Sequence, residues 1–209
     1  MSYFEHPYCS NSALSALGAE LGILPEIKGD SYNNFRMGSL FDAVVTEPAK
    51  LDLITNRILD TDYSFTTDEY KRCLMMKREL EKNSLYQVYI SANPDFQKEV
   101  YVDNFSFGDF ELNMKAKLDY FVPGTVADLK STDSSSQEQF ENACEMFGYH
   151  RQMWLYCNLT DCDKAILFGV SKKRPHNVFT VIIKKGDDRW KLGEEQIKEL
   201  AFKFKLLKL

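Results

Sequence analysis

The chain has 209 residues, of which 44% are hydrophobic and 27% are charged. This composition supports a buried core and excludes a disordered chain, and the length predicts one domain over residues 1–209. The net charge of −5 excludes a protein whose whole surface binds nucleic acid, although a local basic channel would still fit.

Apolar runs in the chain are short. Residues 165–170 form one of the longest, which is far too short for a membrane-spanning helix. The N-terminus has neither the basic nor the apolar segment of a secretion signal. None of the five cysteines forms a C-x-x-C pair, so we expect reduced thiols in a cytoplasmic protein that has no membrane partner.

The first part of the chain is predicted to be helical, because capping residues precede apolar residues at helical spacing. The expected helices begin near Ser10 or Ser12, at Asn33 or Asn34, and at Thr66, whose capping box with Glu69 predicts a helix to about Lys82.

After Asn83 the apolar residues alternate with polar ones, which is typical of strands. We expect strands over residues 86–91, 98–103, 110–120 and 125–131, and a later pair over 164–171 and 178–185. A capping box formed by Ser135 and Glu138 predicts a long helix to about Tyr156, bent at Gly148. A last helix is predicted from one apolar stripe: Ile197, Leu200, Ala201, Phe204 and Leu207. The predicted fold is α/β, with a central mixed sheet of about five strands flanked by helices.

Two acidic residues lie near the predicted turn at Pro123-Gly124. If the hairpin is centred there, Asp119 lies opposite Asp128, and Lys130 shares a face with Asp128. Like charges that face each other across a hairpin are destabilising, and a bound divalent cation would offset their repulsion. The same pattern also fits a solvated sheet face whose lysines neutralise the acids, and a shift of one residue in register would separate the pair.

Four stretches of the sequence carry a resemblance to a known group of proteins. Asp119 followed by Asp128-Leu129-Lys130 resembles the PD-(D/E)xK nuclease signature, and more narrowly that of the exodeoxyribonuclease VIII (RecE-type) and phage lambda exonuclease group. The other three stretches are residues 8–14 (family S-x-S-x-L), 38–48 (G-T-x-x-H-x-x-x-x-E-P) and 148–156 (Q-x-x-x-Y).

The resemblance implies a restriction-endonuclease-like core and a metal-dependent exodeoxyribonuclease that degrades linear duplex DNA from 5′ to 3′. It implies that Asp119, Asp128 and the Leu129 carbonyl bind Mg²⁺ or Mn²⁺, with Lys130 assisting catalysis. Asp42 stands where the family usually has histidine, and we expect it to complete the metal site.

By the same resemblance, Gln152 and Tyr156 are expected to contact DNA, since they share one helical face. The implied partners are duplex DNA ends, a single-strand annealing recombinase of phage or prophage type, and further copies of the chain in a ring. Two other functions stay open: a non-catalytic DNA-binding or assembly module, which the change to Asp42 would suit, and a structure-specific endonuclease.

Overall fold

The computed structural model describes residues 3–25 and 31–208. The α-helices are α1 (Asn11–Glu20), α2 (Ser31–Thr46), α3 (Thr67–Lys82), α4 (Ser84–Ser91), α5 (Gln137–Met146), α6 (Tyr149–Leu159) and α7 (Asp188–Lys208). The strands are β1 (Leu51–Asp52), β2 (Arg57–Ile58), β3 (Asp95–Ser106), β4 (Glu111–Val122), β5 (Thr125–Thr132), β6 (Lys164–Ser171) and β7 (Val178–Lys184). A short 3₁₀ helix, η1 (Pro48–Lys50), follows α2.

The main sheet has five strands in the order β3-β4-β5-β6-β7. Its only parallel pair among the described strands is β5 with β6, and the other neighbours are antiparallel. The connection from β5 to β6 runs through α5 and α6, as a parallel pair requires. The predicted α/β fold with a mixed five-stranded sheet is therefore confirmed.

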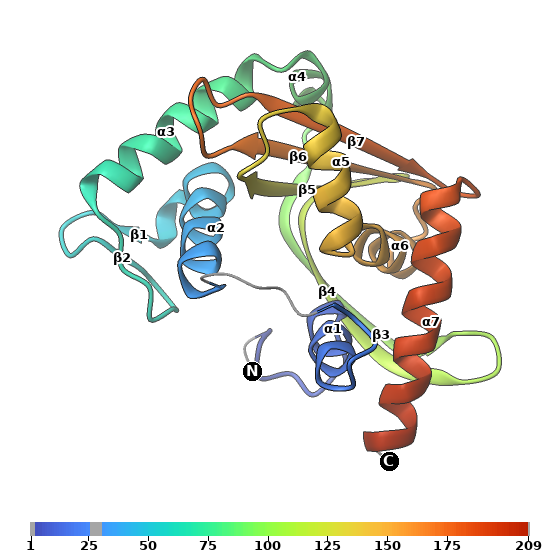
Figure 1. The fold of residues 1–209 in the computed structure, drawn as a ribbon. Coiled ribbons are helices and arrows are strands. Elements are labelled where there is room, and N and C mark those ends of the chain that lie inside the picture. Colours follow the sequence, from blue (N-terminus) through green and yellow to red (C-terminus); the bar gives the residue numbers. More distant parts are fainter. Residues whose placement is uncertain (1–2, 26–30, 209) are drawn as a thin grey trace.

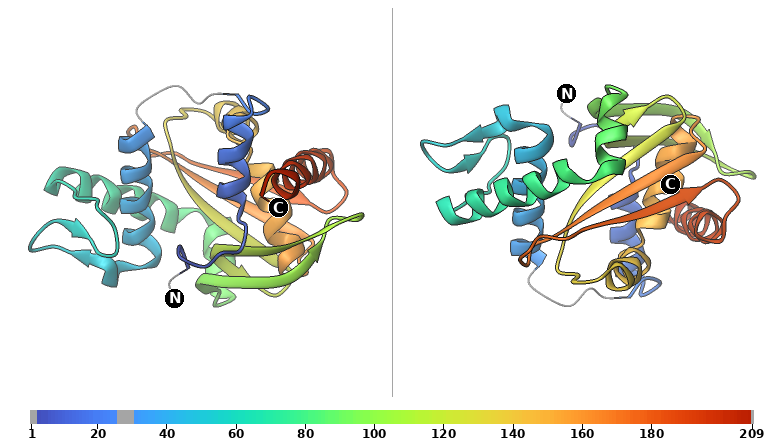
Figure 2. Two further views of the ribbon diagram at one scale, coloured as in Figure 1. Left: turned by 90° about the horizontal axis from the view of Figure 1, so that it is seen from below. Right: turned by 90° about the horizontal axis from the view of Figure 1, so that it is seen from above.

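Helices cover both faces of this sheet. Figures 1 and 2 show α2, α3 and the β1–β2 hairpin on one side, and α6 and α7 on the other. Alternate residues of β5 and β6 supply the two cores: Val126 and Leu167 pack under α5, α6 and α7, whereas Ala127 and Phe168 pack under α2, α3 and α4. No described helix has the length and apolarity to cross a membrane.

Several predicted elements are confirmed. Ser10 caps α1, and Thr66 and Glu69 form the predicted capping box of α3. The last helix and the two late strands are also present, although residue 185 lies outside β7. The predicted caps Asn33 and Asn34 lie inside α2, which begins at Ser31.

Residues 86–91 were expected to form a strand, and this prediction is wrong. They belong to α4, because the Asn83 side chain accepts a hydrogen bond from the Tyr86 amide and caps a helix. Tyr86 and Tyr89, three residues apart, then bury one helical face against Tyr120 and Phe168.

The predicted long helix over residues 135–156 is two helices. The cap is Ser136 rather than Ser135, with the Ser136 hydroxyl accepting from the Gln139 amide. Gly148 has a φ of 66°, a left-handed conformation that ends the first helical segment before α6 begins.

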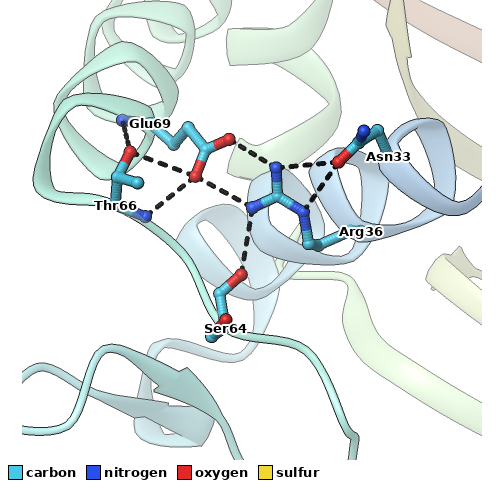
Figure 3. A network of polar contacts seen from close by, with 5 residues as sticks. All are labelled: Asn33, Arg36, Ser64, Thr66 and Glu69. Carbon is cyan, nitrogen blue, oxygen red and sulfur yellow. Dashed lines mark hydrogen bonds and ion pairs between the residues drawn. The ribbon is translucent and has the colours of Figure 1, made fainter.

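An ion pair joins α2 to the start of α3 (Figure 3). The Arg36 guanidinium contacts both carboxylate oxygens of Glu69, at 2.5 and 2.9 Å, and also donates to the Ser64 carbonyl. Glu69 is the acidic member of the α3 capping box, so one carboxylate serves the helix cap and the ion pair together. This arrangement fixes α2, which carries Asp42 less than two turns further on.

Candidate active site

The hairpin between β4 and β5 has the predicted centre. Val122 pairs with Thr125 and Tyr120 with Ala127 across the two-residue loop Pro123-Gly124. Gly124 has a φ of 82°, as the third position of a type II turn requires. The ladder ends at the Tyr120–Ala127 pair, and beyond it the Asp119 carboxylate accepts the Leu129 amide at 2.8 Å. A side chain thus replaces the next backbone hydrogen bond at the point where the strands separate.

Asp128 lies in a buried polar cluster with residues of β5 and α6. Its Oδ2 is 2.6 Å from the Lys130 ammonium, and its Oδ1 accepts from the Gln152 amide at 2.9 Å. Gln152 also accepts from Lys130 at 3.1 Å and donates to the Tyr156 hydroxyl at 2.9 Å. The side-chain amide of Gln152 therefore fixes the acid and the lysine relative to each other. Lys130 also lies over the Tyr149 ring, 4.6 Å from its centroid.

A second polar cluster joins Asp42 of α2 to Asp119 of β4. The link is Gln97 of β3, whose Nε2 lies 3.2 Å from both oxygens of Asp42 and 3.3 Å from Asp119 Oδ1. The same nitrogen is 2.9 Å from the Thr46 hydroxyl oxygen, and that hydroxyl is 3.1 Å from Asp42 Oδ1. Asp42 and Asp119 thus share one hydrogen-bond donor, so the structure brings Asp42 close to one of the two hairpin acids.

The electrostatics of the three carboxylates are coupled. Burial, together with the charges of Asp128 and Glu47, raises the pKa of Asp42 to about 6. Burial and the charges of Asp42 and Asp128 also raise the pKa of Asp119 well above its ordinary value. Burial alone would lower the pKa of Lys130, but the neighbouring Asp128 carboxylate raises it overall, so the lysine is held as a cation.

The acids of both clusters line one pocket of about 840 Å³. The predicted site residues that line it are Asp42, Asp119, Asp128, Leu129, Lys130, Gln152 and Tyr156. Ser39 of α2 and Met146 of α5 lie on its wall, and Lys172 after β6 adds a positive charge. Residues from distant parts of the sequence therefore converge where α2, β5 and α6 meet, and their individual roles stay predictions.

The donor set suits a hard divalent cation such as Mg²⁺ or Mn²⁺, which prefers carboxylate and carbonyl oxygens. Asp128 Oδ2 is buried and makes no hydrogen bond, only the ion pair with Lys130. Within residues 3–25 and 31–208, however, no three His, Cys, Asp or Glu side chains form a ready metal-binding cluster.

Gln97 is the member of the site that the sequence did not predict. It lies just before the predicted strand over residues 98–103, and nothing in the sequence there marks one glutamine. Its position depends on a positive φ of 50° and on the register of β3, in which Phe96 pairs with Tyr120 and Lys98 with Leu118. Neither of these features can be inferred from the residue types alone.

A mixed sheet with one aspartate before a hairpin and an Asp-x-Lys triplet after it defines the PD-(D/E)xK nuclease fold. The family model described as "PDDEXK-like domain of unknown function (DUF3799)" matches residues 26–208. The chain belongs to this family, and the resemblance to the PD-(D/E)xK superfamily is confirmed.

Among solved structures, one match supports this fold, and two others are similar at lower TM-scores. A crystal structure described as a "Putative exonuclease" from Eubacterium rectale has a TM-score of 0.65 at 14% identity, covering 97% of this chain and 84% of that one. A phage related exonuclease from Haemophilus somnus has a TM-score of 0.44 at 15% identity, covering 95% and 83%. The alkaline exonuclease LHK-Exo from Laribacter hongkongensis has a TM-score of 0.39 at 14% identity, covering 81% and 90%. No curated protein matches the sequence.

Proposed function

We propose that the protein is a divalent-metal-dependent deoxyribonuclease that digests linear duplex DNA from its ends, in the 5′ to 3′ direction. The observation that carries this proposal is the convergence of three carboxylates and one half-buried lysine in a single pocket of a PD-(D/E)xK fold. Neither a solvated sheet face nor a purely structural ion pair would need Asp42 and Asp119 to converge on one amide nitrogen.

The carboxylates of Asp42, Asp119 and Asp128, with the Leu129 carbonyl, would hold Mg²⁺ or Mn²⁺. When bound, such a cation would polarise a phosphodiester and make a nearby water more acidic. The chain's own contribution is to orient the carboxylates: the Leu129 amide holds Asp119, and the Gln152 amide holds Asp128.

Lys130 would stabilise negative charge on the phosphate. Its raised pKa keeps the ammonium protonated, so it acts as a fixed positive charge and not as a base. Its direct contacts with Asp128 and Gln152 position it in advance, so little reorganisation is needed during reaction. Gln152 and Tyr156 face this cluster, and we retain contact with DNA as a second role for both.

Attack from DNA ends rests on the resemblance to the exodeoxyribonuclease VIII and lambda exonuclease group. The same likeness motivates a ring-shaped homo-oligomer and a partnership with an annealing recombinase of phage or prophage type. The five cysteines are free thiols in the structure, which suits action in the reducing cytoplasm.

The test is a digestion time course on linear duplex and on covalently closed circles of the same sequence, with Mg²⁺, Mn²⁺ or EDTA. We expect linear duplex to be digested only with metal, loss of a 5′ label before a 3′ label, and no linearisation of the circles. Lys130→Met should reduce turnover at least about 100-fold while leaving duplex affinity almost unchanged.

Rapid linearisation of closed circles would replace the exonuclease proposal with the endonuclease alternative. Binding of duplex without cleavage under any metal condition would favour a non-catalytic module. Two observations favour this non-catalytic module as the second candidate. Asp42 replaces the family histidine, and the described residues contain no ready metal-binding cluster.

A further inference from the structure

The side-chain amide of Gln97 lies at a point where oxygens from three residues converge. Asp42, Thr46 and Asp119 place four oxygens within 2.9–3.3 Å of Gln97 Nε2. A carboxamide nitrogen has only two N–H donors, so it cannot make four good hydrogen bonds at once. At least two of the four oxygens therefore lack a good hydrogen bond from this amide.

The backbone around Gln97 is strained in a way that serves this contact. Gln97 has a φ of 50°, in the left-handed region that side chains other than glycine rarely adopt. Its neighbours pair in register with β4, which places Gln97 across from Asp119. A strained backbone of this kind persists only where the surrounding contacts hold it in place, and such residues are concentrated at functional sites.

We propose that Gln97 is a placeholder: in the metal-free protein its amide occupies the position that a divalent cation takes between Asp42 and Asp119, and binding of the cation displaces it. This inference rests on the proposed function in so far as the site binds a metal. The N–H groups carry partial positive charge, so they lessen the repulsion between the two acids when no cation is present. A cation carries a full double charge and suits four hard oxygens far better.

The proposal has a thermodynamic signature. If the amide must leave before the cation enters, the contacts of Gln97 oppose metal binding and stabilise the metal-free protein. Removal of the amide should lower the melting temperature of the metal-free protein and, at the same time, tighten metal binding. A metal ligand would behave in the opposite way, because its removal weakens binding.

The experiment uses the full chain and three variants: Gln97→Ala, Gln97→Met and Asn104→Ala. Gln97→Met keeps the length of the side chain but lacks the donors, so it remains informative if the alanine variant folds poorly. Asn104 lies in the same strand with the same φ of 50°, and it is exposed away from the carboxylates, so it controls for truncation of a strained residue. Titration calorimetry with MnCl₂ gives the affinity, and thermal melts in EDTA give the stability of the metal-free protein.

We expect both Gln97 variants to bind Mn²⁺ about 3- to 10-fold more tightly than the unmodified chain, which corresponds to the loss of about one competing hydrogen bond. Their melting temperatures in EDTA should fall by about 2–4 °C, and Asn104→Ala should leave the affinity unchanged. Mn²⁺ binding by a Gln97 variant when the unmodified chain binds none would support the proposal still more strongly.

Equal or weaker Mn²⁺ affinity in both Gln97 variants, with normal binding by the unmodified chain, would overturn the placeholder alone and leave the proposed nuclease intact. If neither the unmodified chain nor any Gln97 variant binds Mn²⁺ or Mg²⁺, the metal-dependent function fails, and the placeholder fails with it.

Discussion

Asp119 and Asp128 are both acids of the β4–β5 hairpin, yet their surroundings differ. Burial and the charges of neighbouring carboxylates raise the pKa of Asp119. Its side chain accepts a hydrogen bond from the Leu129 amide, and an asparagine oxygen could accept the same bond. Asp128 balances the positive charge of Lys130, which is largely buried. The two positions should therefore respond differently to loss of a negative charge.

We predict that Asp119→Asn leaves the metal-free protein as stable as before or more stable, whereas Asp128→Asn lowers its free energy of unfolding by about 2 kcal/mol by leaving Lys130 unpaired. Both variants should lose DNA cleavage. Urea unfolding in EDTA measures the stabilities. A large loss of stability in the Asp119 variant would show that this acid is mainly structural.

Asp42 gives a pH-dependent prediction. Its pKa is raised to about 6 in the folded chain, so its protonated form stabilises the fold. That contribution is complete below the unfolded pKa, near 4, and is lost as the pH rises through about 6. We therefore compare the free energy of unfolding of the unmodified chain with that of Asp42→Asn in EDTA. The difference (unmodified chain minus variant) should fall by about 2–3 kcal/mol between pH 4 and pH 7.5.

This difference belongs to the coupled carboxylates as a group, since Asp119 and Asp128 interact with Asp42. Parallel stability curves for the two proteins over this range would contradict the prediction. Urea unfolding at pH 4, 6 and 7.5 is sufficient to distinguish the outcomes.

At the scale of elements, α2 carries Asp42 and is fixed to α3 by the Arg36–Glu69 ion pair (Figure 3). Hydrogen bonds from Arg36 and Thr66 lower the pKa of Glu69 to about 2. Its stabilising contribution is therefore present above the unfolded pKa, near 4.5, and is lost as the pH falls toward 2. Both side chains of the pair are less than one-fifth exposed, so solvent screens this pair less than one at the surface.

We predict that Glu69→Gln lowers the free energy of unfolding by about 2 kcal/mol at pH 7, because it loses a bidentate ion pair and weakens a helix cap. Glu79→Gln is the matched control in the same helix. Glu79 pairs with Lys82 at the surface, so its variant should change stability by less than about 0.5 kcal/mol. Equal effects at both positions would show that the α2–α3 link is unimportant.

The elements that the sequence predicted are those with strong local signals. The hairpin centre followed from one Pro-Gly turn and strict alternation, and the α3 helix from its capping box. The wrong prediction at residues 86–91 has a physical cause: Tyr86 and Tyr89 suit a strand or one face of a helix, and the tertiary contacts with Tyr120 and Phe168 select the helix.

Within the site, Asp119, Asp128 and Lys130 were expected from their spacing around the turn, whereas Asp42 was expected only from the resemblance to the nuclease family. The carboxylate contacts of Gln97 were not predictable, because they depend on a left-handed backbone conformation near the start of β3. The two hydrogen bonds of the Gln152 side chain, to Asp128 and from Lys130, were also not predictable, since they depend on how α6 packs against β5. Both contacts depend on tertiary geometry, which a single sequence does not encode in its local pattern.

At the scale of the molecule, the two cores share one sheet. Neighbouring residues of β5 and of β6 point into opposite cores, so neither core can lose its packing while these strands stay ordered. We therefore predict one cooperative thermal transition for the chain, with equal calorimetric and van't Hoff enthalpies, as expected for a single domain. Two resolved transitions in differential scanning calorimetry would show that α2, α3 and the β1–β2 hairpin form a separate folding unit.

The irregular backbone of β3 has a further consequence, for solubility. β3 is an edge strand of twelve residues, and a regular edge of that length offers a row of unpaired backbone groups on which another chain could add a strand. The left-handed residues Gln97 and Asn104, and the shift in register between Val102 and Phe105, interrupt that row. The distortion that brings Gln97 to the carboxylates thus also protects the sheet against edge-to-edge aggregation, and a redesign that straightened β3 would lose both at once.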